Sequence, residues 1–469
     1  MNLLLLLPLL LPCAGAALAI RRPVKGALIA LMALTPAACA AAGLWGGALR
    51  LPCLPGLDLV LRADGIAALF SVLFSLMFLA AGVFGFEYLH GGLDRFYSFF
   101  LLTLAAMLGL CYAGNLFTFY LFYEAMTLLS FPLVLHEGTA ASRGAAVRYL
   151  GYSLFGAALV LAGFFVLGEA AGADFAPGGV GVAPSPLLRW AVLLMLIGFG
   201  GKAGMMPLHD WLPTAHPEAP APASAVLSGV ITKGGVLGIL RTVYWLVGPD
   251  LLRGSFVQYT ALGLALATVF CGSMLAYKEK ILKKRLAWST VSQVSYVLFG
   301  LLLLNPAGFV GGILQAVFHA VAKVCLFLCA GTVICKTGKT RVDQLEGIGR
   351  QLPLMLFCFC MAGLSLVGIP PLAGFVSKWY LAEGSLTALP GWGWAGAALL
   401  LVSALLTAGY LLPPVSKGFF PGEDFCAPAI PCGVCVRLPL AALAAAALLL
   451  GLFPGGLIQW LTALAGSLL

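Results

Sequence analysis

The stretch GFGGKAGMMPLHDWLPTAHPEAPAPASAVLSGVITKGGVLGILR, residues 198–241, decides how the chain is built. Its two ends are apolar, yet Lys202 and Lys233 stand inside those ends, and prolines and two histidines separate them. A lysine at the centre of a membrane-spanning helix costs about 3 kcal/mol to insert, so it marks a paired or hydrated site. We therefore interpret the stretch as two membrane helices, each with one buried cation, joined by a proline-rich turn.

The composition of the whole chain predicts an all-α polytopic membrane protein. Of its 469 residues, 62% are hydrophobic and 9% are charged, and the mean hydropathy is +1.05, whereas a soluble domain has roughly 25% charged residues. With about 20 residues to a span, the apolar segments predict about 14 transmembrane helices. They are expected over 2–20, 26–43, 63–87, 96–112, 114–135, 146–168, 187–207, 222–246, 256–277, 287–304, 308–335, 353–383, 394–413 and 439–465.

The lysines and arginines support this helix count. Seventeen of the 26 fall in loops that follow odd-numbered helices, and four fall in the alternate loops. The positive-inside rule then places the first set in the cytoplasm and both termini on the outer side of the inner (plasma) membrane. The net charge of +9 follows this topology and forms no long basic run, so no nucleic-acid partner is expected. The chain also has no phosphate-binding loop, which argues against ATP-driven transport.

Two of the predicted spans contain helix breakers. Pro207 interrupts the seventh span, whereas Pro370, Pro371 and Gly374 interrupt the twelfth and are followed by Lys378. Proline removes a helical hydrogen bond, and in transporters such broken helices line ion sites. Because the two breaks are five helices apart, we predict two inverted five-helix repeats. The predicted domains are helices 1–3 in 1–95, the first repeat (helices 4–8) in 96–250, the second repeat (helices 9–13) in 251–415, and a C-terminal loop with helix 14 in 416–469.

Buried ionisable residues predict a pathway for protons. Glu124 lies in the middle of the fifth span, and His319 and Lys323, four residues apart, share one face of the eleventh. Burial disfavours the charged form of a lysine and a nearby carboxylate favours it. A Glu–Lys pair of changing separation therefore takes up and releases a proton. The predicted pathway is Glu124, Lys202, Lys233, His319, Lys323 and Lys378, and His209 and His216 are either accessory proton carriers or helix caps.

The sequence shows no motif for a cofactor. All but one of the pathway residues are basic, whereas a Na⁺ site needs clustered oxygen ligands. Cys426, Cys432 and Cys435 precede the last span, the latter two as a CxxC, and we interpret them as reduced structural thiols rather than as a metal or redox site. We expect neither cofactor nor metal, so the driving energy must come from partner subunits or from an ion gradient.

The segment PLHDWLPTAHPEAPAPASAVLSGVITKGGVLGILR resembles the signature of the antiporter-like subunits shared by respiratory complex I (NADH:quinone oxidoreductase), Mrp-type Na⁺/H⁺ antiporters and membrane-bound hydrogenases. The resemblance extends through FYEAMTLLSFPLVL, AWSTVSQVSYVLFG, FHAVAKVCLFLCAGT and GIPPLAGFVSKWYL and covers about residues 60–415. It implies 14 helices with two inverted repeats, and other membrane subunits as partners. By position it implies a Glu124–Lys202 pair, a connecting Lys233, a central His319–Lys323 pair and a terminal Lys378.

Three functions compete at this point. The first is a proton-translocating subunit of a redox-driven complex, either complex I-like or hydrogenase-like, which the PLHDWLP stretch favours. The second is a subunit of an Mrp-type antiporter that exchanges H⁺ for Na⁺ without redox chemistry, which the GIPPLAGFVSK stretch favours. The third is a standalone carrier of an organic solute. Such a carrier would need a central recognition pocket, whereas the titratable residues here form a line through successive helices.

Overall fold

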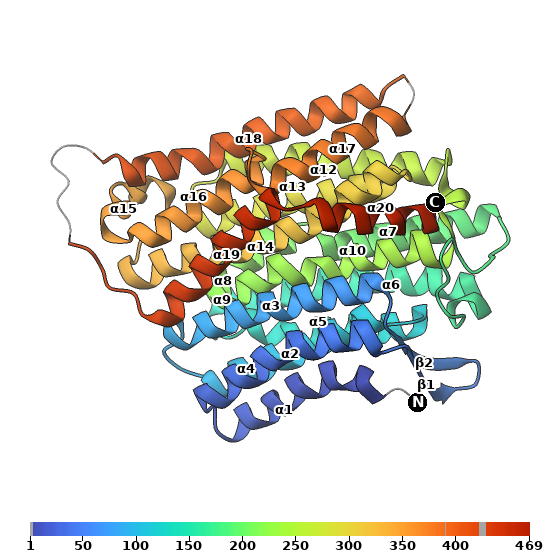
Figure 1. Ribbon diagram of the computed structural model, residues 1–469, viewed down its shortest axis with the longest axis horizontal. Coiled ribbons are helices and arrows are strands. Elements are labelled where there is room, and N and C mark those ends of the chain that lie inside the picture. The colour runs from blue at the N-terminus through green and yellow to red at the C-terminus, as the bar shows by residue number, and fades with distance from the viewer. Residues whose placement is uncertain (1–2, 390, 422–427) are drawn as a thin grey trace.

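The computed structural model describes residues 3–389, 391–421 and 428–469, and these are almost entirely helical. The helices lie side by side in one bundle, with the N-terminal helices along one side and α16–α18 along the other (Figure 1). The helices are α1 Leu7–Arg21, α2 Lys25–Trp45, α3 Gly65–Tyr88, α4 Leu93–Tyr112, α5 Leu116–Val134, α6 Ala140–Leu167, α7 Pro186–Ala203, α8 Trp211–Glu218, α9 Ala221–Val226, α10 Thr232–Arg241, α11 Pro249–Leu252, α12 Phe256–Lys278, α13 Leu282–Leu302, α14 Pro306–Thr337, α15 Ile348–Gln351, α16 Pro353–Val367, α17 Ala373–Ala388, α18 Gly393–Phe419, α19 Val434–Leu452 and α20 Gly455–Leu468. Short 3₁₀ turns are η1 Leu3–Leu6, η2 Gly168–Ala171 and η5 Val342–Leu345, and π-helical turns are η3 Leu227–Ile231 and η4 Thr242–Leu246.

The membrane architecture predicted from composition is confirmed. Within the described residues, twelve helices are long and apolar enough to cross a bilayer. The predicted span 287–304 corresponds to α13, which has 21 residues but carries several polar side chains and is buried along most of its length. The predicted span 353–383 is divided into α16 and α17. A helix that is buried in protein does not need an apolar surface, which explains why α13 is the more polar one.

Both predicted helix breaks are present. Residues 204–210, which include Pro207, separate α7 from α8, and residues 368–372, which include Pro370 and Pro371, separate α16 from α17. The first half of each pair ends on a left-handed glycine, Gly204 with φ 94° and Gly368 with φ 92°, a conformation that costs glycine little. Gly374 lies instead in the first turn of α17, where a Cβ atom would overlap the carbonyl oxygen of Ser365 on α16.

Two parts of the fold differ from the sequence prediction. The last predicted span, 439–465, is two helices, because Pro454 and the glycines after it end α19 and start α20. A β-hairpin that the prediction left as a loop follows α2. Its strands, β1 Ala48–Leu54 and β2 Leu57–Arg62, pair antiparallel around Gly56, which has φ 77°. The hairpin lies at the same end of the bundle as both chain termini (Figure 1).

The core is organised around α14. This helix is buried from Gly308 to Val333, and it lies in the middle of the bundle (Figure 1). It packs against helices from both halves of the chain, namely α3, α9, α13, α16, α17 and α19. Any charged side chain in this buried stretch is therefore kept from lipid and must find its partners inside the protein.

Candidate functional site

Lys202 lies in the last turn of α7, just before the break, and only 2% of it is exposed. Its ammonium group donates hydrogen bonds to Thr127 Oγ1 on α5 at 2.9 Å, and to Tyr149 Oη and Ser153 Oγ on α6 at 2.7 and 3.1 Å. The ammonium also stands 4.4 Å from the centroid of the Tyr149 ring. Three neutral hydroxyls thus match the three donors of a protonated lysine.

Glu124 is half-buried on α5, one turn before Thr127. Its carboxylate accepts a hydrogen bond from Tyr120 Oη at 3.1 Å. Among the ion pairs of the described residues, none joins Glu124 to Lys202, although the carboxylate lies within electrostatic range of the ammonium. In this conformation a hydroxyl of α5 takes the place of the carboxylate at the ammonium, and the predicted Glu124–Lys202 pair stays a prediction.

Lys233 and His319 meet in the middle of the bundle. Lys233 begins α10 directly after the π-helical turn η3 and is completely buried, as is His319 on α14. The ammonium nitrogen of Lys233 lies 2.6 Å from Nδ1 of His319, and it donates to the carbonyl oxygen of Ser228 at 2.9 Å. Nε2 of His319 has no hydrogen-bond partner among the described residues. An imidazole in this position can accept a proton on one nitrogen and release another from the opposite side.

Two hydroxyls and two backbone carbonyls lie between Lys323 and Lys233. The ammonium of Lys323 donates to the carbonyl oxygen of Leu286 on α13 at 2.9 Å, and Thr290 Oγ1 donates to the same oxygen at 3.0 Å. Thr290 Oγ1 is 2.7 Å from Ser228 Oγ, and the carbonyl of Ser228 accepts from Lys233. Hydrogen bonds therefore run from α14 through α13 to the turn η3.

Glycines of α10 hold its lysine close to the helix that carries Lys202. A Cβ atom on Gly235 would overlap the carbonyl oxygen of Phe199 on α7 and would come within 2.7 Å of the Ala203 amide nitrogen. Only a residue without a side chain lets the two backbones approach this closely. The two buried cations are thus carried by helices in direct backbone contact.

Lys378 lies in α17 just after the second break. Its ammonium donates to the carbonyl oxygens of Leu366 and Val367, the last residues of α16, at 2.5 and 2.7 Å. It also lies 5.3 Å from the centroid of the Tyr296 ring. Lys378 therefore satisfies carbonyls that the end of α16 leaves without helical partners.

A polar network that the sequence analysis missed links the middle of α14 to the helix of Lys378. Gln315 on α14 donates to Gln293 Oε1 on α13 at 2.9 Å, and Ser377 on α17 donates to Gln315 Oε1 at 2.6 Å. Gln293 donates in turn to Thr407 Oγ1 on α18 at 3.4 Å, and Tyr410 Oη donates to the same atom at 3.3 Å. The sequence feature that could have predicted this network is the presence of glutamines inside otherwise apolar helices.

The two histidines of the turn between the lysine helices have different surroundings. His216 on α8 is fully buried, its ring stacks 4.7 Å from that of Phe327, and neither ring nitrogen has a partner among the described residues. His209 is half-buried in the break and lies 5.5 Å from the Trp288 ring. Neither side chain caps a helix, because neither makes a hydrogen bond to a helix end in the described part of the chain.

One further buried cation has a structural partner. Arg241, at the end of α10, donates two hydrogen bonds to the carboxylate of Asp64, at 2.6 and 3.0 Å. Asp64 also accepts from the amide of Ala67 and thereby caps α3. A two-bond guanidinium–carboxylate pair fixes its geometry firmly, so we assign Arg241 to the scaffold.

The thiols near the last span form no metal site in the described residues. Cys432 and Cys435 are free, and Cys426 lies outside the residues that the structure describes. Across residues 3–389, 391–421 and 428–469, no three His, Cys, Asp or Glu side chains gather closely enough to hold a metal ion.

Comparison with known proteins then identifies the chain. Residues 113–407 match the family described as "NADH:quinone oxidoreductase/Mrp antiporter, TM". The chain belongs to this family. The matched segment of this antiporter-like subunit contains all six residues of the predicted pathway.

Members of the family from different complexes are similar to this antiporter-like subunit. NADH-quinone oxidoreductase subunit N of Desulforudis audaxviator (strain MP104C) is 35% identical over 376 residues, which are 78% of this chain and 74% of that relative. Hydrogenase-4 component B of Escherichia coli (strain K12) is 35% identical over 344 residues, 69% of this chain and 50% of that relative. A chain in the structure of the Mrp complex from Dietzia sp. DQ12-45-1b superposes with a TM-score of 0.88 at 26% identity and covers 100% of this chain and 98% of that chain.

Proposed function

We propose that this antiporter-like subunit moves protons within a multisubunit, redox-driven membrane complex of the complex I or hydrogenase type. The observation that carries the proposal is the 2.6 Å contact between Lys233 and His319. Two buried titratable nitrogens at this separation can exchange a proton, and both are enclosed by protein rather than by lipid. Hydrogen bonds continue from this pair toward Lys323.

The chemistry of the predicted pathway favours H⁺ over Na⁺ as the transported ion. Of its six residues only Glu124 is acidic, and the oxygens around Lys202 already accept hydrogen bonds from an ammonium. A sodium ion would need several oxygen ligands that are free of such donors. Amines and an imidazole instead bind and release protons one at a time.

We place the gated step of transport between Lys202 and Lys233. Within the described residues, no hydrogen bond joins the hydroxyl cluster around Lys202 to the Lys233–His319 pair, although their helices touch. In the proposed cycle, approach of Glu124 favours the protonated form of Lys202, and its withdrawal drives the proton toward Lys233. A conformational change in partner subunits would move Glu124 and so couple their chemistry to proton release.

The alternative is a subunit of an Mrp-type Na⁺/H⁺ antiporter without redox chemistry. The similarity to a chain of the Dietzia Mrp complex, over the full length of this chain, supports it. Both functions use the same residues and both require other membrane subunits, so the identity of the partners decides between them. In either case we propose that the chain lies in the inner (plasma) membrane with both termini outside, as the charge distribution of the loops indicates.

Purification of the intact complex from native membranes tests the proposal. We expect iron–sulfur or hydrogenase subunits to co-purify, and we expect an electron donor to drive proton uptake into liposomes that contain the complex. Recovery of small antiporter subunits, with proton flux that depends on a Na⁺ gradient and not on an electron donor, would replace the proposal by the Mrp alternative. Normal uptake by a complex with Lys233→Ala would refute both.

A further inference from the structure

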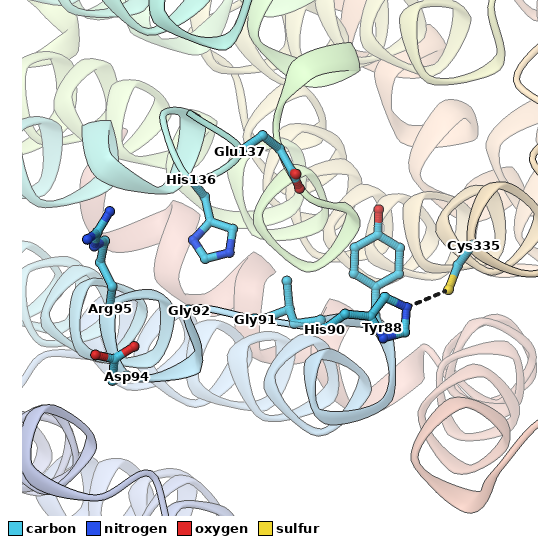
Figure 2. Close-up of a pocket in the computed structure, with 10 residues that line it drawn as sticks. Tyr88, His90, Gly91, Gly92, Asp94, Arg95, His136, Glu137 and Cys335 are labelled. Carbon is cyan, nitrogen blue, oxygen red and sulfur yellow. Dashed lines mark hydrogen bonds between the residues drawn. The ribbon is translucent and has the colours of Figure 1, made fainter. Parts of the chain in front are cut away.

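A pocket of about 560 Å³ opens at the end of the bundle away from the chain termini. It is formed by the α3–α4 connection, the residues after α5 and the last turn of α14 (Figure 2). Its titratable side chains are His90, Asp94, Arg95, His136, Glu137 and Cys335. Partial burial lowers the pKa of His136, so this ring is a neutral proton acceptor near pH 7. The pocket thus gathers proton-binding groups at the end where the charge distribution predicts the cytoplasm.

Glu137 is an exposed residue that lines this pocket. Figure 2 shows its carboxylate pointing away from His136 and toward the side of the pocket where Tyr88 lies. The carboxylate is within electrostatic range of Lys283, at the start of α13, which also feels Glu218. Lys283 is 6% exposed, and its ammonium donates to the carbonyl oxygen of Ala219 at 2.7 Å and to that of Pro217 at 3.4 Å. The lysine is therefore buried and bound to backbone oxygens at the end of α8.

His216 directly precedes Pro217, whose carbonyl oxygen accepts from Lys283, and its ring stacks on Phe327, one helical turn beyond Lys323 on α14. The charges of Lys323 and Lys283 both act on its ring, which is completely buried and has no hydrogen-bond partner for either nitrogen among the described residues. A buried polar group without a partner costs about 1–3 kcal/mol. A side chain that destabilises the fold in this way, within electrostatic range of two lysines, is better explained by proton transfer than by packing.

We infer that protons reach the centre of the subunit from this pocket, through Glu137, Lys283 and His216 to Lys323. The inference rests on the proposed function and specifies the uptake route of that same pathway. In each step one N–H bond breaks and another forms. The Lys283 ammonium gives its proton to a neutral His216 ring nitrogen, and the imidazolium gives the proton on its other nitrogen to a neutral Lys323 amine. His319 stands one helical turn from Lys323 on the same face of α14.

The entrance of this route is separate from the hydroxyl cluster around Lys202, although the route passes through His216 on α8, the second half of the same broken helix. The pocket is formed by the ends of α3, α5 and α14, whereas Lys202 is enclosed by hydroxyls of α5 and α6 deeper in the bundle. The central residues can therefore be loaded from the pocket while the Glu124–Lys202 part of the subunit sets when the proton is released.

Substitution of Lys283 by arginine tests whether this lysine carries protons or only supplies a structural positive charge. Arginine keeps the positive charge and the donors for the carbonyls of Pro217 and Ala219, but it does not give up its proton in proteins. In inverted membrane vesicles that contain the assembled complex, we expect Lys283→Arg and His216→Leu to slow proton uptake by about 100-fold, as expected for loss of a positioned proton-transfer group. Lys284→Arg, one residue away at an exposed pair with Glu279, is the matched control and should leave uptake unchanged.

The outcomes distinguish the uptake route from the function on which it rests. Uptake at the wild-type rate in Lys283→Arg, together with lost uptake in Lys233→Ala, would overturn the route alone. Wild-type uptake in Lys233→Ala would overturn the proposed function itself.

A measurement on the unmodified pocket keeps the inference testable if these variants do not assemble. Cys335 is exposed at the pocket and lies 3.9 Å from Nε2 of His90. A membrane-impermeant cationic methanethiosulfonate that reaches the cytoplasmic face should attach there and slow proton uptake in the wild-type complex. It should not change the rate of a Cys335→Ser complex relative to that complex before treatment. Full modification of Cys335, verified by mass spectrometry, without a change in uptake would show that protons enter elsewhere.

Discussion

The broken helices α7–α8 and α16–α17 are built alike, but they place their lysines on opposite sides of the break. Lys202 precedes its break and is held by three hydroxyls that belong to other helices, α5 and α6. Lys378 follows its break and is held by two backbone carbonyls at the end of α16, within its own helix pair. Hydroxyls can rotate and can donate as well as accept, whereas carbonyls can only accept. The surroundings of Lys202 can therefore stabilise either protonation state, and those of Lys378 stabilise the cation.

The lysines beside the two helix breaks therefore have different surroundings, and we expect them to have different roles in the two halves of the protein. At α16 the ammonium satisfies carbonyls and opposes the negative end of the helix dipole. At α7 the glycine turn at Gly204 ends the helix, and the ammonium points across to neighbouring helices. We therefore expect Lys202 to matter for transport more than for stability, and Lys378 to matter for both.

The largest effect is expected at the first break. Lys202→Ala or Glu124→Ala should reduce proton translocation by about 100-fold or more, because each change removes one member of the predicted switch. Vesicle acidification measured with a pH-sensitive dye reports the rate, and the amount of complex in the membrane should match the wild type. Normal acidification by either variant would remove the first break from the pathway.

The free energy of unfolding should distinguish Lys378, beside the second break, from Lys202, beside the first. Lys378→Met leaves two carbonyls of α16 without their donor, which should destabilise the subunit by about 1–3 kcal/mol. Lys202→Met should cost less, because its hydroxyl partners can bond to other hydroxyls, as Tyr149 already does with Ser130 at 2.6 Å. Thermal unfolding of the purified complexes measures this difference, and equal losses would show that the two lysines have the same structural role.

Substitution of Lys378 by arginine, at the second break, tests the same comparison through both stability and transport. Lys378→Arg keeps a cation that can bind the carbonyls of Leu366 and Val367, so thermal stability should stay within about 1 kcal/mol of the wild type, the size of one typical hydrogen bond. Transport should nevertheless fall, because arginine does not release its proton. Full transport by this variant would assign Lys378 to the scaffold together with Arg241.

The smallest effect is expected from a single hydroxyl. Tyr149→Phe removes one of the three acceptors of Lys202 but keeps the ring over which the ammonium stands. A hydrogen bond to a charged group is worth about 1.5–3 kcal/mol, and we expect the low end of this range because two hydroxyl partners remain, so proton uptake should fall roughly tenfold. Tyr152→Phe on the same helix serves as the control and should keep the wild-type rate. If both variants behave alike, the hydroxyls around Lys202 do not set its protonation.

The sequence was sufficient to predict the membrane helices and the charged residues and prolines within them. The membrane helices could be predicted because the bilayer sets their length and composition. Lys202 and Lys233 could be predicted as site residues because a charge in such a helix is costly. Pro207 and Pro370 identified the breaks for the same kind of reason, since proline cannot continue the helical hydrogen bonds. The hairpin after α2 was missed because a short alternating segment between two long apolar runs looks like a loop.

The sequence did not predict the uncharged polar residues of the site. Thr127 and Gln315 are of residue types that occur in many membrane helices, and only packing shows that they contact Lys202 and Ser377. The contact between Lys233 and His319 joins residues 86 positions apart, and helical periodicity carries no information on such pairs. The separation of Glu124 from Lys202 was equally hidden, because spacing along a chain does not reveal which rotamer a carboxylate adopts.

The contact between Lys233 and His319 also has a consequence for how many charges the centre can hold. The two nitrogens are 2.6 Å apart and belong to α10 and α14, which lie in the first and the second of the two predicted repeats. Only one hydrogen fits between them, and two full positive charges at this distance would repel each other strongly. Full protonation of both side chains at once is therefore disfavoured, so a pathway that runs through this pair would carry one proton at a time.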